Sequence, residues 1–364
     1  MFNGGAMTKR VRSRKGKTLL AALLVFIAII ALLFIVRAVG MAANSRTPPG
    51  GINEDLYVDI NGSRQWISIY GEDRDNPLLL YLHGGPGSAT SMYDYAFTRK
   101  WADVYTVVSW DQRNCGKSLN SSPVSELSCA QLVDDGLALT EFLRDYMETD
   151  KITLLGHSWG SYLGCKMALE RPEYYDCFIG TGQLVDMREN ERLLAEAAAG
   201  WAEGDAAGEA LVAKLDPESP DMEHYGARNA LLERYGYGLF AAGRDYNLVS
   251  AVIFNPYYSL GDWMRYLTGG NGAYTGLLLS EEFTSLSLWD ETEYEVPFYS
   301  INGDMDYQVN YELSRAYFDA VDAPYKEFFT MENMTHGLLE SRSVEFSDII
   351  HEIAAGRGST GNGG

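Results

Sequence analysis

The pentapeptide Gly156-His157-Ser158-Trp159-Gly160 restricts the fold of this chain more than any other feature. It follows the apolar run Ile152–Leu155, which is typical of a buried strand, and it precedes Ser161–Glu170, whose pattern is helical. A turn that leads directly from a strand into a helix admits only small residues at the two glycine positions and holds the central hydroxyl exposed. The sequence therefore predicts Ser158 as a nucleophile at the carboxyl end of a strand.

Strand-like and helix-like segments alternate on both sides of this motif, in the order that produces a mostly parallel sheet. Between them, Cys129–Tyr146 has apolar residues at helical spacing, and the segment 187–290 is a series of acid-rich and alanine-rich helical stretches broken by Gly and Pro. We interpret 187–290 as a helical cap inserted after the sixth strand. The predicted strands are Leu56–Ile60, Gln65–Tyr70, Leu78–Leu82, Tyr105–Trp110, Ile152–Leu155, Phe178–Gly180, Val296–Ile301 and Tyr325–Thr330.

A second glycine-rich motif, His83-Gly84-Gly85-Pro86-Gly87, follows the strand Leu78–Leu82. Glycines allow a backbone to approach a substrate carbonyl closely. In the α/β-hydrolase fold, the loop at this place supplies one N–H of the oxyanion hole, and the residue after the nucleophile supplies the other. We therefore expect the N–H groups of Gly85 and Trp159 to stabilise an oxyanion. The two motifs together predict an α/β-hydrolase fold.

The acid and the base of a catalytic triad are expected later in the chain, in the order serine, acid, histidine. Asp304 and Asp306 both follow the strand Val296–Ile301, and Asp306 is favoured because a Gly-x-x-Asp turn usually presents the acid at this place. His336 lies in the loop after the last strand, whereas the other histidines lie in the cap, on the terminal helix or beside other motifs. We predict Ser158 as nucleophile, His336 as base and Asp306 as the acid that orients it.

No cofactor is expected for this chemistry. The four cysteines show no CxxC or metal-ligand spacing, so a structural metal is not predicted.

The first 40 residues differ from the rest, because a basic segment (1–18) precedes the uncharged run Leu19–Val36. As a helix, that run would be ~27 Å long, which is about the thickness of a bilayer core. We predict a transmembrane anchor over 19–39, followed by a linker over 40–51, with a cleavable signal as the alternative. Since the basic residues precede the span, the N-terminus is expected in the cytoplasm and the catalytic domain outside.

After residue 40 the chain carries 22 basic and 50 acidic residues, a net charge of −28. Such a surface repels nucleic acid and anionic lipid headgroups, so no nucleic-acid partner is expected. The predicted hydrolase core comprises 52–186 and 291–355, and the glycine-rich end, 356–364, is expected to be a flexible tail. Nothing in the sequence indicates an oligomeric state.

Three motifs together resemble the prolyl iminopeptidase family of α/β hydrolases: the segment 83–87, Asp111-Gln112-Arg113 with Gly116 and Ser118, and the segment 156–161. The resemblance implies a serine aminopeptidase that removes an N-terminal residue, commonly proline, from short peptides, and that uses acidic groups near the cap to hold the free ammonium. Candidates for those groups, among which no choice is made, are Glu189, Glu191, Glu196 and Glu203.

The sequence departs from the family at two positions. Asn114 replaces the glycine that usually follows Arg113, and asparagine tolerates the left-handed dihedrals that such a turn needs. Tyr307 stands where some members carry a glutamate after the catalytic aspartate. The aromatic stretch Tyr257–Tyr266 could line a pocket for a proline ring, although packing is the favoured interpretation.

Two other functions are compatible with the motifs. A carboxylesterase or amidase acting on a small acyl substrate would use the same triad without an ammonium subsite, and a requirement for a free N-terminus separates it from an aminopeptidase. A membrane-tethered binding protein without turnover is disfavoured because the triad and both oxyanion loops are intact. Epoxide hydrolases and dehalogenases carry an aspartate at the position of Ser158.

Overall fold

A computed structural model describes residues 5–120, 122, 127–269 and 272–360. Within these residues, all the predicted strands are present in one eight-stranded sheet of order β1-β2-β4-β3-β5-β6-β7-β8. β1 and β2 form an antiparallel hairpin, β2 is antiparallel to β4, and the remaining neighbours are parallel. The strands are β1 (Ile52–Ile60), β2 (Ser63–Gly71), β3 (Leu78–Leu82), β4 (Thr106–Asp111), β5 (Ile152–His157), β6 (Tyr175–Thr181), β7 (Phe298–Gly303) and β8 (Lys326–Met331).

Helices cover both faces of the sheet, because successive side chains of a buried strand point to opposite faces. In β3, Leu80 belongs to the core that α3, α4 and α12 cover, whereas its neighbour Tyr81 belongs to the core that contains Trp101 and Phe346. The covering elements are α3 (Cys129–Met147), α4 (Trp159–Glu170) and α12 (Tyr311–Ala320) on one face, and α2 (Tyr95–Thr98), η1 (Arg99–Trp101), α13 (Leu338–Ser341) and α14 (Ser343–Thr360) on the other.

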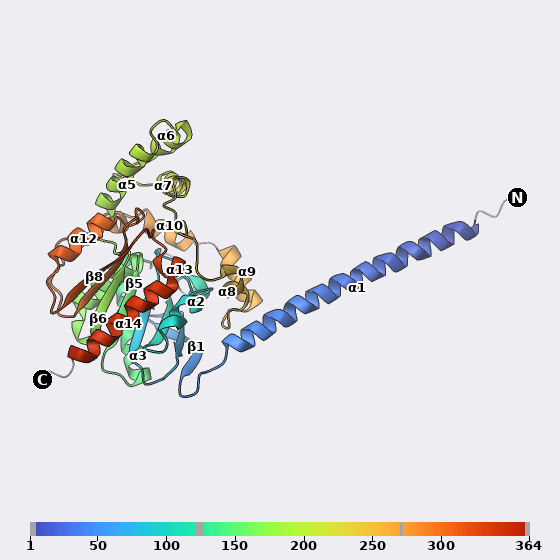
Figure 1. Cartoon of the computed structure of the whole chain (residues 1–364), viewed down its shortest axis with the longest axis horizontal. Coiled ribbons are helices and arrows are strands. Elements are labelled where there is room, and N and C mark those ends of the chain that lie inside the picture. Colours follow the sequence, from blue (N-terminus) through green and yellow to red (C-terminus); the bar gives the residue numbers. More distant parts are fainter. Residues whose placement is uncertain (1–4, 121, 123–126, 270–271, 361–364) are drawn as a thin grey trace.

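The cap lies between β6 and β7, at the place in the chain where the sequence predicted it. Acidic and amide side chains at the N-caps of several cap helices accept backbone N–H bonds, which explains part of the acid-rich composition of this segment. Figure 1 shows α5, α6 and α7 on one side of the cap and α8 and α9 beside the end of α1. The cap helices are α5 (Met187–Trp201), α6 (Ala206–Val212), α7 (Met222–Arg234), α8 (Leu248–Ile253), α9 (Leu260–Gly269), α10 (Gly272–Leu278) and α11 (Glu281–Thr284).

The N-terminal helix α1 (Gly5–Asn44) leaves the domain as one long helix (Figure 1). Its part Lys17–Asn44 is long and apolar enough to cross a membrane, a property that a signal sequence shares. The predicted linker was wrong at its start, since residues 40–44 continue the helix. Met41, Ala42 and Ala43 are strong helix formers. This end of the helix also contacts the cap, because Gly40 lies against the ring of Phe254 and the Asn44 amide donates to the Phe254 carbonyl at 2.9 Å.

The predicted tail also needs correction. Helix α14 continues to Thr360, so residues 356–360 are helical, and 361–364 lie outside the described residues. Glycine lowers helix stability but leaves the backbone hydrogen bonds possible, so its presence alone does not end a helix.

Candidate active site

Ser158 occupies a strained turn between β5 and α4, with φ +57° and ψ −123°. Larger side chains would clash at the two neighbouring glycines. A Cβ on Gly156 would lie 2.1 Å from the carbonyl oxygen of Gly160, and a Cβ on Gly160 would lie 2.1 Å from the carbonyl oxygen of Leu82. The Ser158 N–H donates to the Thr181 carbonyl at 2.9 Å, which ties the turn to β6. This geometry holds the side chain at the carboxyl end of the sheet.

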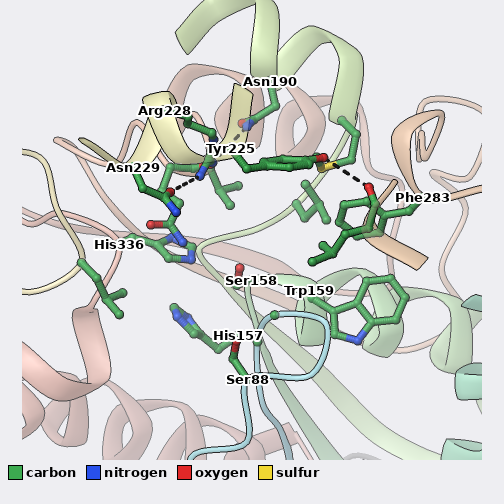
Figure 2. Close-up of a pocket in the computed structure, with 18 of the residues that line it drawn as sticks. Ser88, His157, Ser158, Trp159, Asn190, Tyr225, Arg228, Asn229, Phe283 and His336 are labelled. Carbon is green, nitrogen blue, oxygen red and sulfur yellow. Dashed lines mark hydrogen bonds between the residues drawn. The ribbon is translucent and has the colours of Figure 1, made fainter. Parts of the chain in front are cut away.

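The Ser158 side chain faces a cavity of about 340 Å³ between the sheet and the cap. Figure 2 shows Ser158 in the middle of this cavity, with His336 on one side and Trp159 on the other. The cap forms the roof of the cavity through residues of α5, α7, α10 and α11, which include Asn190, Tyr225, Leu278 and Phe283. The cap therefore covers the candidate nucleophile.

His336 is held by Asp306, whose Oδ2 lies 2.7 Å from the imidazole Nδ1. The other carboxylate oxygen of Asp306 accepts the N–H groups of Gln308 and Val309, both at 2.9 Å, so the orientation of the carboxylate is fixed. Because a carboxylate accepts, Nδ1 of His336 donates, and Nε2 keeps a free lone pair. Asp304 is exposed, and its contact is with the Met334 N–H at 3.3 Å.

The loops of Gly85 and Trp159 both line the cavity, and Gln112 joins them. The Gln112 amide donates to the His83 carbonyl at 3.1 Å and accepts the Trp159 indole N–H at 3.0 Å. His83 donates from Nδ1 to the Gly84 carbonyl at 2.8 Å and accepts the Gln112 backbone N–H at Nε2. Burial lowers the pKa of His83 to about 4, so the ring is neutral and stabilises this loop through its two hydrogen bonds.

The turn after β4 has the predicted left-handed residue, since Asn114 has φ +60°. Arg113 makes two hydrogen bonds of 2.7 and 2.8 Å to the buried carboxylate of Asp135. Within the motif Asp111-Gln112-Arg113, Gln112 therefore links the loop of Gly85 to Trp159, and none of the three residues lines the cavity. The sequence showed the motif but not this positioning role of Gln112.

The sequence pattern of one protein family, described as the alpha/beta hydrolase fold, matches residues 77–311. The chain belongs to the alpha/beta hydrolase fold family. The prediction of this fold and of a hydrolase enzyme is therefore confirmed.

Among curated proteins, this hydrolase is 28% identical to the probable aminopeptidase YbaC of Bacillus subtilis (strain 168), over 77% of this chain and 89% of YbaC. It is 33% identical to a putative proline iminopeptidase of Mycoplasma genitalium over 34% of this chain. That match spans 39% of the Mycoplasma protein, well under two thirds of its length. The resemblance to the proline iminopeptidases is thus confirmed.

Two solved structures show the breadth of the fold. A proline iminopeptidase-related protein from Thermus thermophilus superposes with a TM-score of 0.58 at 20% identity, over 84% of this hydrolase and 98% of that chain. The epoxide hydrolase VrEH1 from Vigna radiata superposes with a TM-score of 0.53 at 21% identity, over 83% and 97%. Fold similarity of this kind does not select a reaction, so the choice must come from the site.

Of the four acidic candidates of the hydrolase cap, Glu191 is the one that lines the cavity. Glu189 and Glu196 both form ion pairs with Arg192 on the outer side of α5, and Glu203 is exposed at the end of that helix. None of these three lines the cavity, because α5 presents opposite faces to the cavity and to solvent.

Glu191 is buried, and neighbouring cationic and hydrogen-bond-donating groups already compensate the charge of its carboxylate. It contacts the Arg228 guanidinium at 3.1 Å and the Nε2 of His224 at 2.9 Å. The Asp216 N–H donates to Nδ1 of His224, which leaves Nε2 as the donor toward Glu191. Burial opposes ionisation, but Arg228 and then His224 outweigh it, so the pKa of Glu191 is lowered. Glu191 therefore holds the cap together rather than offering a free charge to a ligand.

Glu191→Ala is expected to lower the free energy of unfolding by about 3–5 kcal/mol, because it leaves the Arg228 guanidinium buried without its carboxylate. The matched variant Glu196→Ala, which removes an exposed pair from the same helix, should change it by less than about 1 kcal/mol. Thermal unfolding of the full chain in detergent measures both changes. Equal stabilities of the two variants would contradict this assignment.

Glu340 is a cavity-lining carboxyl that the sequence analysis missed. It is 2% exposed, and its Oε2 has no hydrogen-bond partner among the residues that the structure describes. Burial raises the pKa of Glu340 to about 7. Glu340 lies on α13, four residues after His336, but that spacing does not show in the sequence that its carboxyl faces the cavity with an oxygen that lacks a partner among the described residues.

Two aromatic features lie outside the cavity. The ring of Tyr307 packs against Trp201 and Tyr237, with centroid distances of 4.8 and 4.6 Å, and it joins the cap to the core. Tyr258 and Trp263 do not line the cavity but contact other parts of the chain, as the packing interpretation of Tyr257–Tyr266 expected.

Proposed function

We propose that this hydrolase is a membrane-anchored serine aminopeptidase that releases an N-terminal proline or a similar residue from short peptides. The observation that carries the proposal is that Ser158 and the hydrogen-bonded pair of His336 and Asp306 meet at one covered cavity, which Ser158 and His336 line. Similarity to a probable aminopeptidase over 77% of the chain supports the substrate class. The apolar helix α1 supports an anchor, with the N-terminus in the cytoplasm and the catalytic domain outside.

In the proposed first step, Nε2 of His336 takes the proton of the Ser158 hydroxyl while Oγ attacks the carbonyl carbon of the first residue. Nε2 is the available base because Nδ1 donates to Asp306. The N–H groups of Gly85 and Trp159 donate to the oxyanion of the tetrahedral intermediate, and each such donor is worth about 3 kcal/mol of barrier.

In the second step, the protonated His336 gives its proton to the leaving amine, and the carbon–nitrogen bond breaks to leave an acyl-enzyme. Water then loses a proton to His336 and attacks the ester carbonyl. The bond between the carbonyl carbon and Oγ breaks, His336 returns the proton to Oγ, and the released amino acid leaves the restored Ser158 hydroxyl. The Asp306 carboxylate stabilises the imidazolium in both steps, and its backbone hydrogen bonds to Gln308 and Val309 keep it in place.

The size of the cavity supports short substrates. A volume of about 340 Å³ is near the lower end of the range for small-ligand pockets, and the cap covers it. A terminal residue fits, whereas a folded protein cannot bring a chain end under the cap.

Glu340 is the group that we propose to hold the substrate ammonium. Glu191 is neutralised by Arg228 and His224, whereas the Oε2 of Glu340 is buried without a hydrogen-bond donor among the described residues. An unpaired buried carboxylate is costly, and a bound ammonium would compensate it. The negative group that the resemblance leads us to seek in the cap would thus come from α13 of the core.

Glu340→Gln is expected to raise KM for a free-amine substrate about 10- to 100-fold, the equivalent of a charge-assisted hydrogen bond of ~1.5–3 kcal/mol. In the parent enzyme, that KM should fall as pH rises through about 7, because the carboxyl then ionises. The decrease should end near pH 8, where the α-amino group of the substrate loses its proton. KM for p-nitrophenyl acetate should be unaffected by the substitution. If free-amine KM is the same in both proteins, Glu340 is not the ammonium partner.

The proposed function is tested with three substrates of the full chain in detergent: proline β-naphthylamide, its N-acetylated form and p-nitrophenyl acetate. Cleavage of the free amine with little cleavage of the blocked amide is the expected result. Equal cleavage of the blocked and free amides, or cleavage of the ester alone, would contradict the aminopeptidase proposal and favour a carboxylesterase or amidase.

A further inference from the structure

Exposed apolar side chains occur on both α8 and α9, at Val249 (66% exposed), Leu260 (43%), Met264 (59%) and Tyr266 (37%). We name these four residues the α8–α9 patch. From residue 248 to residue 268 the charged residues are Asp262 and Arg265, which pair with each other, in a chain that is 22% charged overall. This segment thus carries a single, mutually paired couple of charges on a strongly acidic domain, and exposed apolar surfaces of this kind mark interaction sites.

The segment that carries the patch is attached to the end of α1 (Figure 1). The Arg37 guanidinium donates to the Tyr258 carbonyl at 2.6 Å and lies 4.9 Å from the ring centroid of Trp263. One turn later Gly40 lies against Phe254, where a Cβ would come within 2.2 Å of the ring, and Asn44 donates to the carbonyl of the same residue. These contacts set the position of α8 and α9 relative to the apolar helix.

The contacts also set the depth of α9. Arg37 is the first charged residue after the uncharged run Leu19–Val36, so the apolar core of a bilayer spanned by α1 would end at its level. Trp263 lies against Arg37, and Met264 follows it, which puts this part of α9 at the boundary between acyl chains and headgroups. Tryptophan and tyrosine are enriched at that boundary.

We propose that the α8–α9 patch is embedded in the outer surface of the membrane that α1 spans, at the level of the lipid headgroups. This inference rests on the anchor in the proposed function. The occupant that fits is a zwitterionic bilayer surface, because the remainder of the domain, with a net charge of −28 after residue 40, is repelled by anionic lipid.

The same segment supports the active site, so membrane contact and catalysis share a structural element. Asn255 donates to the carbonyls of Ser91 and Met92, both at 2.8 Å, and Tyr258 shares a hydrogen bond of 2.6 Å with the Ser91 hydroxyl. These bonds hold the turn that follows the proposed oxyanion loop. A bilayer that holds the α8–α9 patch would therefore also act on this turn, which lies between the cavity-lining residues Thr90 and Tyr93.

The test places one fluorophore at a time in the full chain, reconstituted in phosphatidylcholine vesicles, through Met264→Cys, Val344→Cys and Leu24→Cys. Val344 is 54% exposed on α14, outside the α8–α9 patch, and is the control that we expect to face water; Leu24 lies in the span. The native cysteines Cys115, Cys129, Cys165 and Cys177 are at most 4% exposed, so the introduced thiol is labelled preferentially. Lipids that carry a nitroxide near the headgroup quench membrane-seated labels, and iodide quenches labels in water.

We expect severalfold stronger nitroxide quenching at position 264 than at position 344, with the reverse order for iodide. Labels at 264 and 344 that behave alike, while the label at 24 is shielded from iodide, would overturn the inference and leave the anchor intact. A label at 24 that iodide reaches freely would show that the anchor itself is wrong. Hydrolysis of p-nitrophenyl acetate by each labelled protein verifies that it is folded.

Discussion

Ser158→Ala is expected to lower kcat by on the order of 10⁶-fold with little change in stability, because the serine Oγ is the atom that forms the acyl-enzyme. Alanine keeps the Cβ, so the backbone at φ +57° is no more strained than in the parent. The rate that remains would come from binding and from the N–H groups of Gly85 and Trp159. The measurement is single-turnover and steady-state hydrolysis of the best of the three substrates.

The matched control is Ser88→Ala. Ser88 also lines the cavity (Figure 2) but takes no part in the proposed proton path. We expect it to retain activity within about tenfold of the parent and to react with a fluorophosphonate, whereas Ser158→Ala should not react. Fluorophosphonate labelling that persists in Ser158→Ala would assign the nucleophile to another residue.

Asp306→Asn is the second large effect, with an expected loss of about 10⁴-fold in kcat. The asparagine amide can donate to Nδ1 of His336, which favours the tautomer whose Nε2 carries the proton and cannot act as a base. Binding should change far less than kcat, because Asp306 contacts His336 and two backbone N–H groups rather than the cavity.

Asp304→Asn makes the same change two residues away, on an exposed side chain, and it should leave kcat near that of the parent. The pair of variants therefore tests the choice between the two aspartates directly. A loss of activity in Asp304→Asn that matches the loss in Asp306→Asn would indicate that the whole turn, and not one carboxylate, is responsible.

The fold was predictable because its signals are local. Each strand is an apolar run of a few residues, and alternation with helical periods leads to a mostly parallel sheet. The turn at Ser158 was local only in part: the steric need for Gly156 arises from the Gly160 carbonyl in the same pentapeptide, whereas the need for Gly160 arises from the carbonyl of Leu82 in β3. Ser158, Asp306 and His336 follow from chain order, and the structure brings Asp306 and His336 into contact, although their catalytic roles stay predictions until the variants are measured.

The sequence did not predict which charged side chains pair, or which become buried, when distant segments meet. Sequence pattern could not separate Glu191 from Glu196 as ligand candidates, because the neutralising Arg228 comes from another helix, 37 residues away. Sequence pattern could not identify Glu340 either. The lack of a hydrogen-bond partner for its Oε2 among the described residues depends on which segments pack around α13.

The contact between the end of α1 and the cap likewise joins Asn44 to Phe254, 210 residues later in the chain. The sequence by itself thus determined the fold class, the order of the candidate catalytic residues and the apolar helix, because these depend on neighbours along the chain. Only the tertiary structure decided which cavity carboxyl has an oxygen without a partner among the described residues, and which surface adjoins the end of the helix, because charge compensation and exposure arise between segments that meet on folding.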